Sequence, residues 1–190
     1  MKTIFRPTLV FFAALTLLCA LVYPLVMAGI GQLAFSHQVG GSLLSLAGQP
    51  IGSRLIGQEF SSARYFWGRP SATTPMPYNA ASSSGSNFGP TNPALIDEVK
   101  ARIAALEAFD PANPAPIPVD LVTSSGSGLD PEISLAAAYY QLERVARTRS
   151  LAPAVVRAAV DGLAQASVLG FLGEPRVNIL ELNLALDRIK

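Results

Sequence analysis

The longest apolar run lies near the start of the chain. Residues 7–30 read PTLVFFAALTLLCALVYPLVMAGI, and no formally charged side chain occurs between Arg6 and Arg54. A helix over these 24 residues would be about 36 Å long at 1.5 Å per residue. The hydrocarbon core of a bilayer is about 30 Å thick. The pattern predicts one transmembrane helix over residues 7–30, with an extension to residue 35 as the alternative.

The charges at the start of the chain predict the orientation of this helix. Lys2 and Arg6 precede the apolar run, and the positive-inside rule places residues 1–6 in the cytoplasm. Residues 36–190 would then form a single domain outside the membrane. A cleaved signal peptide is the rival interpretation. Its apolar core typically spans about 7–15 residues, and because this run is longer, the pattern favours a retained anchor.

Two predicted helices in the outer domain begin with the same motif, a capping residue followed by proline. Asn92-Pro93 precedes apolar positions at helical spacing: Leu95, Val99, Ile103 and Leu106. Asp130-Pro131 precedes a second stripe: Leu135, Ala138, Leu142 and Val145. The spacing predicts a helix after each pair, with Asn92 and Asp130 as the N-caps.

Two further helices are predicted near the end of the chain. Pro153 begins one that continues to about Ala166, and Asn178 caps the last, with Glu181 three residues on in a capping-box arrangement.

Strand signals are short and few. Residues 51–67 contain two short strands or turns, and residues 119–123 form a strand candidate. Residues 68–93 hold five prolines and five serines and show no period of 2 or 3.6, which predicts a long irregular loop. The expected fold class is α+β: a mainly helical outer domain with a few short strands, anchored by one N-terminal transmembrane helix.

Composition excludes several classes of function. The net charge is +1, which provides no field for a polyanion, so nucleic acid is excluded as a partner. The single histidine, His37, lies next to the end of the apolar run, which disfavours a Ser–His–Asp triad. One histidine and one cysteine, Cys19, are too few for a zinc cluster, and one cysteine cannot form a disulfide within the chain. The sequence predicts a protein that is not an enzyme, has no metal site and holds no cofactor firmly.

The segment SSGSGLDP at residues 124–131 is the first candidate site. Its glycines and hydroxyls lead into the predicted helix, and such a start can bind an anion through backbone N–H groups. A tight turn with a hydroxyl-rich cap is the alternative, favoured because Asp130 would repel a phosphate. We expect Gly126 and Gly128 to adopt backbone angles that a β-carbon would oppose.

Two other groups of residues each leave two interpretations open. Tyr65, Phe66, Trp67 and Arg69 are either interface anchors or the core of the domain. Gln141 and Arg144 either point from one helix face into a site or belong to a solvated face, and Arg144 would complement the C-terminal end of the helix dipole.

Short motifs in a fixed order follow the apolar helix over essentially the whole chain, and they resemble the KdpC family, whose members are subunits of the bacterial potassium-importing P-type ATPase. The motifs are Gly52-Ser53-Arg54-Leu55-Ile56-Gly57-Gln58, Tyr65-Phe66 with Arg69-Pro70-Ser71, Tyr78-Asn79, Ser84-Gly85-Ser86-Asn87, Val122-Thr123-Ser124-Ser125-Gly126-Ser127-Gly128-Leu129-Asp130-Pro131, Gln141 with Arg144, Gly173-Glu174-Pro175-Arg176-Val177-Asn178, and Leu182-Asn183.

The resemblance implies three partners in the Kdp complex: a potassium-channel-like subunit, a P-type ATPase subunit and a small single-helix subunit. Potassium would be handled by those partners, and lipid would surround the anchor. It also implies a location in the bacterial cytoplasmic (inner) membrane, with the bulk domain in the periplasm.

Family descriptions present such a protein as a catalytic chaperone that raises the ATP affinity of the ATPase subunit. They link ATP to Ser124, Ser125, Gly126, Ser127, Gly128 and Gln141. The predicted topology puts these residues outside the cell, whereas a P-type ATPase binds ATP in the cytoplasm. The residues therefore favour a role in assembly, or in covering the outer ion entrance, over direct ATP contact. A membrane-anchored ligand-binding protein or enzyme acting alone is the alternative function.

Overall fold

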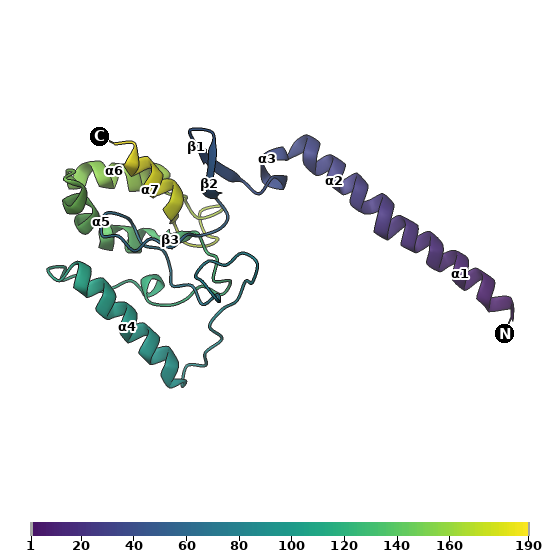
Figure 1. The fold of residues 1–190 in the computed structure, drawn as a ribbon, viewed down its shortest axis with the longest axis horizontal. Helices are drawn as coiled ribbons and strands as arrows, with labels where there is room; N and C mark the ends of the chain where they lie inside the picture. Colours follow the sequence, from purple (N-terminus) through teal and green to yellow (C-terminus); the bar gives the residue numbers. More distant parts are fainter. Residues whose placement is uncertain (1, 190) are drawn as a thin grey trace. The chain divides into compact units, whose positions relative to one another are not determined.

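The computed structural model describes residues 2–189, and the chain divides into two compact units, residues 1–43 and 44–190. The first unit is almost entirely helical. Helix α1 (Lys2–Leu17), a π-helical turn η1 (Leu18–Val22) and helix α2 (Tyr23–Ala34) follow one another without a break, and the short helix α3 (Ser36–Val39) comes next (Figure 1).

The N-terminal helix is long and apolar enough to cross a membrane. The candidate span covers 31 residues, from Ile4 to Ala34, and no residue of its most hydrophobic window is buried within the protein. The span ends at Ala34, close to residue 35, where the longer of the two predicted helices ends. Pro24 lies inside the span and has no N–H to donate. The π-helical turn ends two residues before Pro24, at Val22, and the N–H of Tyr23 donates to the carbonyl of Leu18.

The strands of the protein form two small antiparallel sheets. Strands β1 (Leu43–Leu46) and β2 (Gln49–Ser53) make a hairpin whose two turn residues, Ala47 and Gly48, both have positive φ, as a type I′ turn requires. Strand β3 (Glu132–Ser134) pairs with β4 (Arg176–Asn178), with Ile133 opposite Val177. The second pair joins segments more than forty residues apart, directly before the helices that follow each strand.

Four helices build most of the second unit: α4 (Pro93–Phe109), α5 (Leu135–Arg149), α6 (Pro153–Leu163) and α7 (Ile179–Asp187). Helices α5, α6 and α7 group together, with β3 beside them, and α4 lies along another side of this unit (Figure 1). The core is formed mainly by fully buried aliphatic side chains of the three grouped helices, among them Val145, Val156, Val160, Leu182 and Leu186. The predicted stripe on α5 is buried as expected, apart from Leu135, which is half-buried.

The capping predictions are confirmed at two helices and wrong at a third. The Asn92 side chain accepts from the N–H of Ala94 at 3.0 Å, and that of Asn178 accepts from the N–H of Glu181 at 3.1 Å. Asp130 is not a helix cap. Residues 132–134 are extended because they pair with β4, so α5 begins at Leu135 and its cap is Ser134.

Two other predicted elements differ in the structure. Residues 119–121 form a 3₁₀ turn, η2 (Val119–Leu121), in place of the strand predicted over residues 119–123. Residues 54–92, all of which the structure describes, contain no helix or strand, so the irregular segment begins earlier than residue 68. Helix α6 ends at Leu163 because the chain there turns extended and pairs Gln165 with Arg176.

Candidate functional site

Two side-chain amides hold the backbone of consecutive aromatic residues in the core. The Gln141 amide on α5 accepts from the N–H of Trp67 at 2.8 Å and donates to its carbonyl at 3.0 Å. The Asn183 amide on α7 does the same for Phe66, at 2.9 and 3.0 Å. All four residues are at least 96% buried. The irregular chain at residues 66–67 is thereby fixed between two helices, because each amide satisfies buried groups that would otherwise lack a partner.

Arg144 extends this network along the same helix. Its guanidinium donates to the carbonyls of Ala63 and Tyr65 and to the side-chain oxygen of Gln141. The side chain lies 3% exposed, and its guanidinium stands over the ring of Trp67, 5.2 Å from the centroid. Burial lowers the pKa of Arg144 to about 10. Gln141 and Arg144 are therefore not a solvated face, and three carbonyl-type oxygens hold the guanidinium of Arg144.

The structure separates the four aromatic and basic interface candidates. Phe66 and Trp67 are core residues, with 0% and 4% of their surface exposed, which is the second of the two interpretations left open by the sequence. Tyr65 is half-buried, and Arg149 stands over its ring at 4.9 Å from the centroid. Arg69 is also half-buried and reaches the serine- and glycine-rich segment.

Residues 124–128 pack against the loop of residues 68–93. The N–H of Ser125 donates to the carbonyl of Pro70 at 3.2 Å, and the carbonyl of Ser127 accepts from the N–H of Ser84 at 3.0 Å. The Ser71 hydroxyl donates to the carbonyl of Gly128 at 2.7 Å. These bonds tie two irregular segments together, and they occupy the N–H of Ser125, a donor that a bound anion would otherwise use.

The hydroxyls of the same segment are also engaged within the domain. Ser124 donates to the hydroxyl of Ser86 at 3.0 Å, and the Ser127 hydroxyl accepts from the N–H of Leu129 at 3.1 Å. Ser125 is 3% exposed. The segment that the sequence singles out thus forms a junction with the loop of residues 68–93, in which Ser125 and Gly128 are buried and Gly126 and Ser127 are exposed.

The two glycines of the segment differ in what they require. Gly128 has φ +68°, and a β-carbon there would lie 2.6 Å from the carbonyl oxygen of Ser84 and 2.6 Å from a methyl carbon of Thr73. Gly126 has no positive φ, and among the described residues no atom lies within 4 Å of a β-carbon built on it. The expectation of a special backbone is confirmed at Gly128 and wrong at Gly126.

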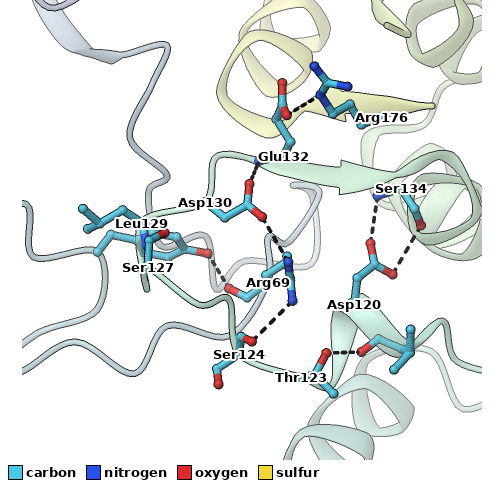
Figure 2. Close-up of polar contacts among 12 residues, drawn as sticks. Arg69, Asp120, Thr123, Ser124, Ser127, Leu129, Asp130, Glu132, Ser134 and Arg176 are labelled. Atoms are coloured by element: carbon cyan, nitrogen blue, oxygen red, sulfur yellow. Dashed lines mark hydrogen bonds and ion pairs between the residues drawn. The ribbon is translucent and has the colours of Figure 1, made fainter. Parts of the chain in front are cut away.

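Arg69 links the segment to the chain that enters β3. It forms an ion pair with Asp130 at 3.1 Å and donates to the carbonyl of Ser124 at 3.3 Å (Figure 2). The other carboxylate oxygen of Asp130 accepts from the N–H of Glu132 at 3.0 Å. Asp130 therefore stabilises the turn before β3 and neutralises the charge of the half-buried Arg69. These two contacts give the aspartate a structural role although no helix begins there.

A cavity of about 590 Å³ opens beside these residues. Its lining includes four carboxylates and two guanidinium groups: Asp120, Asp130, Glu132, Glu174, Arg69 and Arg176. Both arginines are already paired, since Arg176 meets Glu132 at 2.6 Å (Figure 2). Asp120 is held by the N–H and the hydroxyl of Ser134, at 2.8 and 3.3 Å. The excess of carboxylates over guanidinium groups gives the cavity a negative electrostatic field. Within the described residues, no group of three or more His, Cys, Asp or Glu could hold a metal ion.

Tyr78 organises the loop, a role that the sequence analysis did not assign although it named the Tyr78-Asn79 motif. Its hydroxyl donates to the carbonyl of Arg69 at 2.6 Å, its N–H donates to the Ser71 hydroxyl at 2.9 Å, and burial raises its pKa to about 12. A β-carbon on Gly57 or Gly68 would lie within 2.7 Å of Tyr78 side-chain atoms, so both glycines leave room for it. The signal in the sequence is an aromatic residue in a loop rich in proline, serine and other small residues.

The structure defines a protein with one N-terminal apolar helix, long enough to cross a membrane, and a small second unit of helices and short strands. The family model described as "K+-transporting ATPase, c chain" (KdpC) matches residues 5–188. The chain is 62% identical to a potassium-transporting ATPase KdpC subunit of Janthinobacterium sp. (strain Marseille) over 188 residues, 99% of this chain and 100% of the relative. It is 63% identical to that of Herminiimonas arsenicoxydans over 188 residues, 99% of each chain. The chain therefore belongs to the KdpC family.

Proposed function

We propose that this chain is an accessory, non-catalytic subunit of an ATP-driven potassium-import complex. The family match over nearly the whole chain carries the proposal, together with the 31-residue apolar helix at its start. The partners are a potassium-channel-like subunit, a P-type ATPase subunit and a small single-helix subunit. The chain belongs to the bacterial inner membrane, with its N-terminus inside and the second unit outside. A protein acting alone is the alternative.

The second unit works in this proposal through protein contacts and does not itself hold ATP. The observation that supports this is the engagement of residues 124–128 with the loop of residues 68–93. The hydroxyl of Ser124 donates to Ser86, and the N–H groups of Ser125 and Gly128 donate to the carbonyls of Pro70 and Ser125. A phosphate group would have to break these bonds before it could use the segment.

The charge around the neighbouring cavity leads to the same conclusion. Four carboxylates face two arginines that are already paired, and a nucleoside triphosphate carries several negative charges. Like charges repel more strongly in a half-buried cavity than in water, because the local dielectric constant is lower. Any rise in the ATP affinity of the ATPase subunit would then come from contact between the two proteins.

The same network assigns Gln141 a structural role in this proposal. Both polar ends of its amide are bonded to the backbone of Trp67, and its oxygen also accepts from Arg144. With 1% of its surface exposed, it has no free group for a nucleotide. Substitution of Gln141 would lower the activity of the complex by loosening the domain.

Titration calorimetry with ATP tests the proposal on two samples. The full chain alone, purified in detergent, should show no saturable heat in the micromolar range. The assembled complex should bind ATP, and removal of this chain should change the KM for ATP of the ATPase subunit. The matched variant is S124A/S125A/S127A. Saturable ATP binding by the chain alone, lost in the triple variant with an unchanged melting temperature, would contradict the contact mechanism.

A pull-down separates the accessory role from the alternative function. The full chain, extracted in mild detergent from cells that make the complex, should bring the three other subunits with it in fixed ratio. A chain that purifies alone under conditions that keep the rest of the complex intact would favour a protein acting on its own.

A further inference from the structure

A short hairpin between α6 and β4 exposes four large apolar side chains. Val168, Leu169, Phe171 and Leu172 have 54%, 79%, 74% and 50% of their surface exposed. No charged residue occurs from residue 162 to residue 173. Four exposed large apolar side chains within five residues are uncommon on a protein that works alone, and such clusters are typical of an interaction site. Residues 168–172 are called the apolar hairpin below.

The apolar hairpin is held in one conformation by its own backbone. Val168 and Leu172 exchange two hydrogen bonds of 2.9 Å, and the N–H of Gly170 donates to the carbonyl of Ser167 at 3.1 Å. A preformed turn loses little conformational entropy when it binds. The side chains are therefore presented in a fixed arrangement before any partner arrives.

The backbone at the tip carries strain. Leu169 has φ +55°, in the left-handed region that disfavours residues with a β-carbon, and Gly170 has φ +79°. Asparagine or glycine would occupy the position of Leu169 at lower cost. The fold thus keeps a 79%-exposed leucine in a strained position where it makes no core contact. Strain of this kind points to a role outside the stability of the domain.

The base of the apolar hairpin carries negative charge. Residues 173–175 line the acidic cavity, and Glu174 is exposed. Within residues 2–189 the Glu174 side chain forms no hydrogen bond or ion pair, and it lies four residues from Gly170 at the tip. A surface that covers the hairpin would bring its own polar edge against this carboxylate.

We propose that the apolar hairpin is an anchor that docks into another subunit of the potassium-transport complex. The complementary surface is an apolar groove with a lysine or arginine at its edge, facing Glu174. Buried aromatic and aliphatic anchors of this type contribute most of the affinity at protein interfaces. The proposal rests on the proposed function, since it requires that the complex exist.

A lipid surface fits the hairpin less well. Membrane-surface segments combine apolar side chains with lysine or arginine that meet the lipid headgroups, and residues 162–173 contain no lysine or arginine. The carboxylate of Glu174 would also be repelled by anionic headgroups. A groove on a protein can accept the aliphatic side chains and the carboxylate together.

Photo-crosslinking of the intact complex tests the proposal. A benzophenone amino acid replaces Phe171 in one full-length variant and Ile96, 50% exposed on α4, in the control. Irradiation should crosslink position 171 to a peptide of another subunit, identified by mass spectrometry, at a yield above that of position 96. Crosslinks from position 171 only to lipid, only to a second copy of this chain, or no more often than from position 96, would overturn the proposal.

Substitution gives a second, independent readout. L169D/F171D should reduce co-purification of the other subunits by about tenfold or more, whereas I96D should leave it unchanged. E174K should weaken assembly in a salt-dependent manner, because it places like charges together. The melting temperature of each full-length variant in detergent shows whether the fold is retained. Normal co-purification by a folded L169D/F171D variant refutes the anchor, whereas a wild-type chain that never co-purifies refutes the proposed function itself.

Discussion

Gln141 and Trp67 are joined as two neighbouring β-strand residues would be, although one partner is a side chain. The amide of Gln141 accepts from the N–H of Trp67 at 2.8 Å and donates to its carbonyl at 3.0 Å. Asn183 repeats the arrangement one residue earlier, at Phe66. Because residues 54–92 are irregular, no strand satisfies these buried backbone groups, and two helices supply side chains that do.

Replacement of Gln141 by alanine should destabilise the domain by about 3 kcal/mol, because the N–H and carbonyl of Trp67 would stay buried without partners. Thermal or denaturant unfolding of the full chain in detergent, without nucleotide, measures the loss. The control is Q165A, at a half-buried glutamine whose side chain has no hydrogen bond within the described residues. A Q141A chain as stable as wild type would show that the amide serves something other than the fold.

Gly128 and Gly126 form a matched pair within one segment. Gly128→Ala should cost about 1–3 kcal/mol, because φ is +68° and the new β-carbon would meet the carbonyl of Ser84. Gly126→Ala should change stability by less than about 0.5 kcal/mol, because its surroundings are open. Equal losses in the two variants, measured by melting temperature, would disagree with the backbone described above.

Asp130 should couple energetically to Arg69. Asp130→Ala removes both the ion pair and the acceptor for the N–H of Glu132, and should cost about 1–2 kcal/mol. Asp130→Asn keeps the acceptor, so a smaller loss is expected. A double-mutant cycle with Arg69→Ala should give a coupling energy of about 0.5–1 kcal/mol. Additive effects would mean that Asp130 acts on the backbone alone.

The protonated form of Tyr78 should stabilise the domain up to high pH. Its pKa is about 12 in the folded state, above the ordinary value of 10. Because the unfolded chain releases this proton first, stability is full below pH 10 and falls as the pH rises from 10 toward 12. Tyr78→Phe should remove that part of the alkaline loss, while lowering stability at neutral pH by about 1 kcal/mol through the lost bond to the carbonyl of Arg69. Unfolding curves at several pH values measure both effects, and an unchanged alkaline slope in the variant would contradict the assignment.

Local sequence signals predicted the elements whose causes are local. The apolar helix follows from an uncharged run, and the starts of α4, α6 and α7 follow from Asn92-Pro93, Pro153 and Asn178, because a capping side chain or a proline acts within one helical turn. The family resemblance, carried by ordered motifs over the chain, is confirmed by the comparisons. The orientation of the anchor and the partners stay predictions.

Tertiary contacts determined the structure at positions where the local sequence pattern predicts a different one. Asp130-Pro131 has the form of a helix start, but residues 132–134 pair with β4 at residues 176–178, a contact that no local pattern encodes, and α5 begins at Leu135. The burial of Gln141 and Arg144 has the same origin, because the backbone groups of Ala63, Tyr65 and Trp67 that they contact lie at least 74 residues earlier in the chain. Sequence alone thus determined the anchor, the main helices and the family, whereas the roles of the polar residues depend on which distant backbone groups folding leaves without a hydrogen-bond partner.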